Sequence, residues 1–121
     1  MSAVPKPPWT LAFHDGAANG YRFSHPKDGA ATFAYDPVTP ERSSTGTYSG
    51  GEPASGDLSD GDASELWSRV AGLEAATSLH GENRNKGTGA FRIESAAGTR
   101  SFIIERSPEL DTFVAYLKRF R

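Results

Sequence analysis

The residues best suited to bind a ligand lie in one run rich in hydroxyl groups and glycine, SSTGTYSGG, which spans residues 43–51. Its hydroxyls and successive backbone N–H groups can bind an anion or a sugar, because glycine lets a ligand approach the backbone closely. The candidate contact residues are Arg42, Ser43, Ser44, Thr45, Tyr48, Ser49 and Glu52. The alternative interpretation is a hydrated turn, or an edge strand that glycine and proline protect from aggregation.

A second polar loop follows His80 and contains the residues ENRNKGTG. In it, Arg84 and Lys86 are placed to contact a phosphate or a carboxylate. A solvated connection between two elements is the simpler interpretation. If this loop and residues 43–51 lie at the same end of a sheet, together they form a better candidate surface than either loop alone.

The chain lacks the spacings of familiar catalytic, cofactor and metal sites. No phosphate-binding G-x-x-x-x-G-K-[ST] run is present, and Ser49 does not lie in a G-x-S-x-G elbow. The acidic segment DLSDGDASE (residues 57–65) does not have the spacing of a calcium loop. Helix capping explains Asp62 and Glu65, and Asp60-Gly61 is typical of an ordinary turn. His14, His25 and His80 form no H-x-x-x-H pattern. These absences predict no catalytic residue, no metal ligand and no cofactor, and they favour a protein that is not an enzyme.

Composition narrows the class of protein further. The net charge of −2 argues against a nucleic-acid partner, and no stretch is apolar enough to cross a membrane. Residues 1–79 carry five Lys/Arg and ten Asp/Glu, whereas residues 80–121 carry eight and five. This asymmetry is compatible with an ordinary solvated surface of mixed charge, or with a dipolar protein that self-associates or binds a charged partner. No cysteine is available for a disulfide framework. We expect a cytoplasmic protein, and a mature secreted protein without its signal would have the same features.

The elements that must position these loops are strands near the amino end. Aromatic residues alternate with small or polar ones over residues 9–13, 21–23 and 33–35, as in half-buried strands. A register with Phe13 opposite Tyr21, Leu11 opposite Phe23 and Phe23 opposite Phe33 places every large apolar side chain on one face. Residues 45–49 are a candidate fourth strand. Two further strands are expected around Phe91–Ile93 and Phe102–Ile104, with Ile93 opposite Phe102 across a turn at Ala96–Thr99.

Helical periodicity indicates two helices. The first is expected to begin at Asp62, with Glu65 completing a capping box, and to end before Gly81. Ser107 and Pro108 mark the start of the second, whose apolar stripe is Leu110, Phe113, Val114, Leu117 and Phe120. The prediction is an α+β fold of five to six mainly antiparallel strands, in the order β-β-β-(β)-α-β-β-α, with both helices on one face. Residues 1–8 are predicted to be a disordered, proline-rich tail without core contacts, and residues 9–121 a single domain with a long irregular loop at residues 36–61.

Three functions are compatible with these features. The first is a non-catalytic protein-interaction module, of the inhibitor or immunity-protein type, which presents the loop at residues 36–61. The second is a small-molecule or anion-binding protein, or a minor enzyme, that uses the loops at 43–51 and 80–89 and a cavity lined by Trp9, Tyr21 or Tyr35. The third is a weak homodimer formed through an edge strand or through the final helix, with Tyr116 and Phe120 in the interface.

Overall fold

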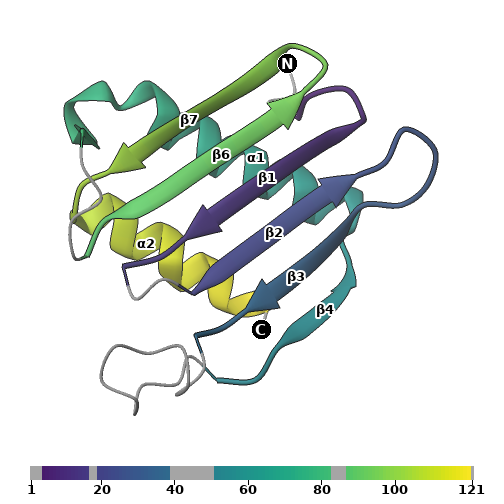
Figure 1. The fold of residues 1–121 in the computed structure, drawn as a ribbon, viewed down its shortest axis with the longest axis horizontal. Helices are drawn as coiled ribbons and strands as arrows, with labels where there is room; N and C mark the ends of the chain where they lie inside the picture. The colour runs from purple at the N-terminus through teal and green to yellow at the C-terminus, as the bar shows by residue number, and fades with distance from the viewer. Residues whose placement is uncertain (1–3, 17–18, 39–50, 83–86, 121) are drawn as a thin grey trace.

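The computed structural model of the protein describes residues 4–16, 19–38, 51–82 and 87–120. Within these ranges, seven strands form one antiparallel sheet in the order β4-β3-β2-β1-β6-β7-β5 (Figure 1). The strands are β1 (Trp9–His14), β2 (Gly20–His25), β3 (Thr32–Asp36), β4 (Ala54–Asp57), β5 (His80–Gly81), β6 (Gly89–Ser95) and β7 (Gly98–Ile104). The helices are α1 (Asp60–Ala75) and α2 (Pro108–Leu117), each continued by a short 3₁₀ segment, Thr77–Leu79 and Lys118–Phe120. The predicted α+β class with both helices on one face is confirmed.

The register of the first three strands is the predicted one. Leu11 lies opposite Phe23, Phe13 opposite Tyr21, and Phe23 opposite Phe33. Directly opposed residues point to the same side of a sheet, so the large apolar side chains of β1, β2 and β3 share one face. Strand β6 then pairs with the other edge of β1, which brings Phe91 beside Phe13. The first strand of the chain is therefore the centre of the sheet.

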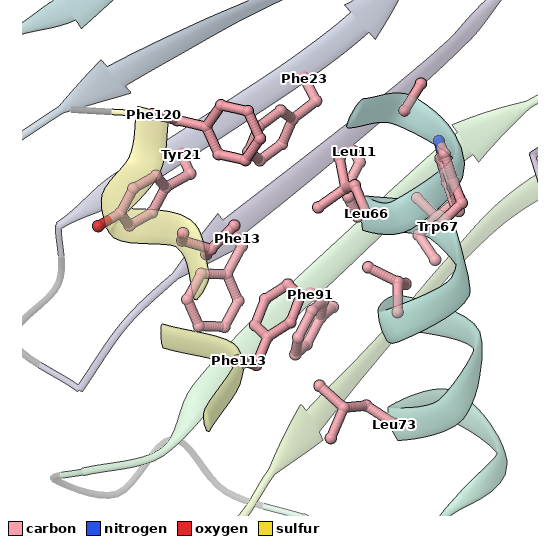
Figure 2. Close-up of a cluster of buried hydrophobic side chains, with 14 of the residues drawn as sticks. Leu11, Phe13, Tyr21, Phe23, Leu66, Trp67, Leu73, Phe91, Phe113 and Phe120 are labelled. Carbon is pink, nitrogen blue, oxygen red and sulfur yellow. The ribbon is translucent and has the colours of Figure 1, made fainter. Parts of the chain in front are cut away.

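Both helices cover the apolar face, and Figure 1 looks onto the opposite face with α1 and α2 behind the strands. Helix α1 contributes Leu66, Trp67, Val70 and Leu73 to the core, and α2 contributes Leu110, Phe113 and Leu117. Their side chains meet the aromatic rings of the sheet, as Figure 2 shows. The Phe113 ring meets Phe13 edge-on at 5.2 Å between centroids, and Phe120 meets Phe23 in the same way at 5.2 Å. Packing of this kind favours edge-to-face contacts because the ring edge is positive and its face negative.

Several sequence-based predictions about strands were wrong. Seven strands are present in the described ranges instead of five to six, because β4 and the two-residue β5 were not foreseen. Strand β4 lies at residues 54–57, within the stretch that was predicted to be irregular, whereas the candidate strand at 45–49 lies outside the described residues. In the last hairpin Phe91 opposes Phe102 and Ile93 opposes Arg100. The turn is two residues tighter than predicted, since it is formed by Ala96 and Ala97 with Gly98 at a φ of 120°.

The ends of the first helix also differ from the prediction. Ser59 is the N-cap, and its hydroxyl accepts a hydrogen bond from the Asp62 backbone N–H at 3.1 Å. Asp62 is thus a residue of the first turn, where its negative charge faces the positive end of the helix dipole. The helix ends at Ala75, and Gly81 belongs to β5. The prediction for α2 is confirmed, with Ser107 as the N-cap and Pro108 in the first turn.

The chain before β1 was expected to be a tail without core contacts. Of this segment the structure describes residues 4–8, in which Val4 is half-buried and packs against the core. The expected absence of core contacts therefore does not hold at Val4.

Candidate functional site: the open face of the sheet

Most of the predicted binding residues lie outside the described residues. These are Arg42, Ser43, Ser44, Thr45, Tyr48, Ser49, Arg84 and Lys86. Glu52 is described and exposed, immediately before Pro53 and β4. The structure therefore defines the ends from which both predicted loops leave, and not the loops themselves.

The described ends of the two loops lie at the same end of the sheet. One loop leaves after β3 and returns at β4, while the other leaves after β5 and returns at β6 (Figure 1). The turn after β1 lies between these loop ends and contacts both of them. Its buried Asn19 donates from Nδ2 to the Asp15 carboxylate at 3.1 Å, and Asn19 Oδ1 accepts the Val38 backbone N–H at 2.8 Å. On the other side, Gly16 lies so close to Gly87 that a Cβ on Gly16 would be 2.7 Å from the Gly87 Cα. One turn thus supports the start of the first loop and the end of the second.

On the face of the sheet opposite the helices, small residues alternate with longer polar ones near the centre. Reading across the strands, one row consists of Ser55, Ala34, Arg22, Ala12, Arg92 and Ser101. The next row, toward the loop end, consists of Asp36, Gly20, His14, Ala90, Ile103 and Gly81. No described helix covers these rows (Figure 1). We call this surface the open face.

Two depressions lie on the open face and share Ala12 and His14. The larger, of about 660 Å³, has Ala12, Ala90 and Ile103 on its floor and Arg92 and Glu82 at its rim. The smaller, of about 340 Å³, lies over Gly20 and Ala34 and is bordered by Arg22 and Asp36. Both exist because short side chains lie between long ones. Since a Cβ on Gly20 would be 3.3 Å from Nε2 of His14, glycine at this position makes room for the imidazole ring.

The cations of the open face differ in their partners. Arg92 donates from Nε to Oε1 of Glu94 at 2.9 Å, two residues along the same strand. Arg22 is exposed, and it makes no hydrogen bond or ion pair with any described residue. Both side chains project from the row that contains Ala12. Neighbouring strands are about 4.8 Å apart, so the two arginine Cα atoms are separated by roughly 10 Å.

The aromatic residues that were expected to line a cavity belong to the core instead. Trp9, Tyr21 and Tyr35 are each 2% exposed, and their rings face the helices rather than the open face. Trp9 meets Trp67 of α1 edge-on at 5.2 Å, and Tyr21 packs on Tyr35 at 4.8 Å. A ligand cavity lined by these three rings is therefore not present in the described part of the molecule.

His80 and Tyr116 lie on the helical side of the sheet. Nε2 of His80 is 3.1 Å from the Leu73 carbonyl near the end of α1, and its ring stacks on Phe102. The phenol of Tyr116 is half-buried, and Arg69 lies over its ring at 4.4 Å. Burial, with smaller contributions from Asp62 and Glu65, raises the pKa of Tyr116, although the cations Arg119 and Arg69 oppose this rise.

Comparison with known proteins finds no relative of this chain. No family model, no curated protein and no solved structure matches this chain. Neither described helix is long and apolar enough to cross a membrane. The described residues also contain no group of three or more histidine and carboxylate side chains placed to hold a metal ion.

Sequence reasoning overlooked Arg22 and Arg92 as site residues. The register of β1 and β2, which the sequence predicted, already places Arg22 beside Ala12 on the face away from the aromatic rings. The position of Arg92 depends on the pairing of β6 with β1 across most of the chain length. No local pattern specifies that pairing, and so the two arginines are brought together only by the three-dimensional structure.

Proposed function

We propose that this chain is a non-catalytic protein-interaction module of the inhibitor or immunity-protein type. Its contact surface consists of the open face and of the loop within residues 36–61. The observation that carries the proposal is the supported origin of that loop beside an uncovered sheet face. A rigid scaffold that presents an accessible loop is a common arrangement for engaging a protein partner.

Packing supports the rigid part of this arrangement. The core lies between the sheet and the helices, so the open face can be buried by a partner without any rearrangement of the core. The start of the loop is held by the hydrogen bond from the Val38 N–H to Asn19. Its return is held by the pairing of β4 with β3, in which Ala54 lies opposite Tyr35. A loop fixed at both ends loses less conformational freedom on binding than a free segment does.

The proposal is tested by capturing a partner from the source cells on the immobilised protein and then measuring affinities with the purified partner. Three variants are compared with the natural chain: Tyr48→Ala, replacement of residues 40–50 by a short glycine–serine linker, and Ala34→Arg on the open face. Ala34 is exposed, so the larger side chain obstructs the surface without entering the core. Ala71→Arg is the matched control, because Ala71 is exposed on α1 at the other side of the molecule.

We expect the linker replacement and Ala34→Arg to weaken binding by about tenfold or more, since each removes part of the contact surface. Tyr48→Ala should weaken binding as the loss of an aromatic anchor does, whereas Ala71→Arg should bind like the natural chain. A partner that binds all four variants with unchanged affinity would contradict the proposal, and so would the recovery of no specific partner.

The larger depression favours the second function, a small-molecule or anion-binding protein. Its volume of about 660 Å³ lies within the range of ligand pockets. Its lining differs from the predicted one, since the aromatic residues are in the core and alanine and isoleucine form the floor. Thermal unfolding in the presence of inorganic phosphate, acetate and simple sugars tests this alternative. A rise in the unfolding temperature that Ala90→Arg abolishes would support it.

A further inference from the structure

We propose that the open face binds a carboxylate group of an extended protein segment between the guanidinium groups of Arg22 and Arg92. This inference rests on the proposed function, because it names the chemical group through which a partner is recognised. The occupant is a segment with one acidic residue, or a chain end, next to an apolar residue.

The geometry provides two cations with a gap between them. Arg22 and Arg92 lie in one row on either side of Ala12, whose side chain ends at Cβ. Their Cα atoms are roughly 10 Å apart, and an arginine side chain spans more than half of that distance, so both guanidinium groups can reach a group above Ala12. The planar guanidinium donates two parallel hydrogen bonds to a carboxylate, which gives this pair a preference for that group.

Hydrogen-bond donors remain available on both side chains. In the described structure Arg22 has no partner, and Arg92 uses only its Nε–H, which binds Glu94 at 2.9 Å. The ion pair with Glu94 is exposed and therefore weak. A second carboxylate can thus bind the terminal N–H groups of Arg92 without first breaking a buried contact.

The surrounding charges favour an isolated carboxylate over a nucleic acid. Asp36 lies in the neighbouring row, Glu82 at the rim of the larger depression, and Glu94 beside Arg92. A phosphate backbone carries a charge on every nucleotide and would be repelled by these groups. A polypeptide segment can instead place neutral residues near them. Ala90 and Ile103 on the floor of the larger depression offer an apolar contact for the neighbouring residue of the segment.

The direct test is a titration of the complete chain with short probes, followed through the backbone amide signals by nuclear magnetic resonance. The first probe is a capped alanine pentapeptide with a central glutamate, and the second is the same peptide with glutamine. A third has a free carboxyl terminus and no acidic side chain, and a short single-stranded DNA is the fourth. We expect the glutamate peptide to shift the amides of Ala12, Arg22 and Arg92, and the glutamine peptide to leave them in place. We also expect the third probe to shift these amides, because its terminal carboxylate is the same chemical group.

Single substitutions test which side chains raise or lower the affinity for the glutamate peptide, and by how much. Arg22→Gln and Arg92→Gln should each weaken binding of the glutamate peptide by about fivefold, as expected for the loss of one exposed ion pair. Glu94→Gln should strengthen binding of the glutamate peptide, because it removes the carboxylate that competes for Arg92. Arg69→Gln and Glu65→Gln are matched controls, since this pair has the same 2.9 Å contact on α1. Both controls should bind like the natural chain.

Three results would overturn the inference: no shift of these amides with the glutamate peptide, equal shifts with the glutamine peptide, or tighter binding of the DNA at the same residues. Failure of the inference is distinguishable from failure of the proposed function. A captured partner whose affinity is unchanged by Arg22→Gln and Arg92→Gln together would overturn carboxylate recognition, while its dependence on Ala34→Arg would still support the interaction module.

Discussion

Among single residues, Gly89 is a buried position that leaves little room for additional volume. A Cβ at this position would lie 2.7 Å from Cδ1 of Leu110 and 2.7 Å from Cε1 of Phe13. We expect Gly89→Ala to lower the free energy of unfolding by about 1–3 kcal/mol, because the packed side chains of Leu110 and Phe13 must shift to make room for the added methyl group. Urea denaturation measures this loss.

Gly72 provides the control for that experiment. It is exposed in the last turn of α1, and nothing lies within 4 Å of an added Cβ. Gly72→Ala should therefore raise the free energy of unfolding by roughly 0.5–1 kcal/mol, because alanine favours the helix. Equal effects of the two substitutions would show that the contact between Gly89 and α2 is not tight.

The phenol of Tyr116 should make the stability of the folded protein depend on pH. Burial raises its pKa in the folded state above the value of about 10 in the unfolded chain. Between these two values the unfolded chain has lost the phenolic proton and the folded chain has kept it, so stability falls as the pH rises through this window. We expect Tyr116→Phe to remove this part of the fall. Urea denaturation of both proteins at neutral pH and above pH 10 measures it, and a constant difference between them across this range would contradict the prediction.

At the scale of the elements, the cap of α1 tests how the first helix begins. Ser59 accepts the Asp62 N–H, so Ser59→Ala should cost about 1 kcal/mol of stability, whereas Ser59→Asp should retain most of it. The control is Ser68→Ala, on an exposed position within the same helix. Thermal or urea denaturation gives the difference. If Asp62 were the cap, as its sequence position suggested, Ser59→Ala would have no effect.

The elements also show what could be predicted from the sequence. Alternation of aromatic residues specifies one face for each of β1 to β3 and excludes a one-residue slip, which would expose all of them. The register predicted with this restriction is the observed one. The predicted pairing of β6 with β7 was wrong by two residues. A shift of one strand by two residues along the other leaves every side chain on the same face of the sheet. The alternation of Phe91, Ile93, Phe102 and Ile104 therefore could not distinguish the two registers. Strand β4, with the sequence ASGD, has no strand-like composition and is held by its pairing with β3.

The candidate site was less predictable than the fold for a related reason. The binding residues predicted from the sequence were in loops, because binding residues often lie there. Arg22 and Arg92 are instead on strands, where an exposed arginine looks like any other solvated side chain in the sequence. Their proximity results from the pairing of β1 with both β2 and β6, which joins segments about seventy residues apart along the chain.

At the scale of the whole molecule, the two tryptophans report whether the chain unfolds as one unit. Trp9 lies on the central strand and Trp67 on α1, and each is 2% exposed. We expect Trp9→Phe and Trp67→Phe to lower stability by about 1–3 kcal/mol each, because a smaller ring leaves a cavity. The fluorescence of the remaining tryptophan and the circular dichroism signal should change together in urea. Separate transitions in either variant would show that the sheet and α1 unfold independently.

The outer rim of β7 has a consequence for how the protein behaves when it is concentrated. Strand β5 pairs with only Ile103 and Ile104, so within the described chain the rim from Gly98 to Phe102 has no strand beside it. Such a rim is a template on which a second molecule can polymerise. Arg100 lies in the middle of this rim, tethered to Glu74 of α1, and places a charge where a growing fibril would have to add its next chain. We therefore expect Arg100→Gln to make this rim more prone to fibril growth in concentrated solution.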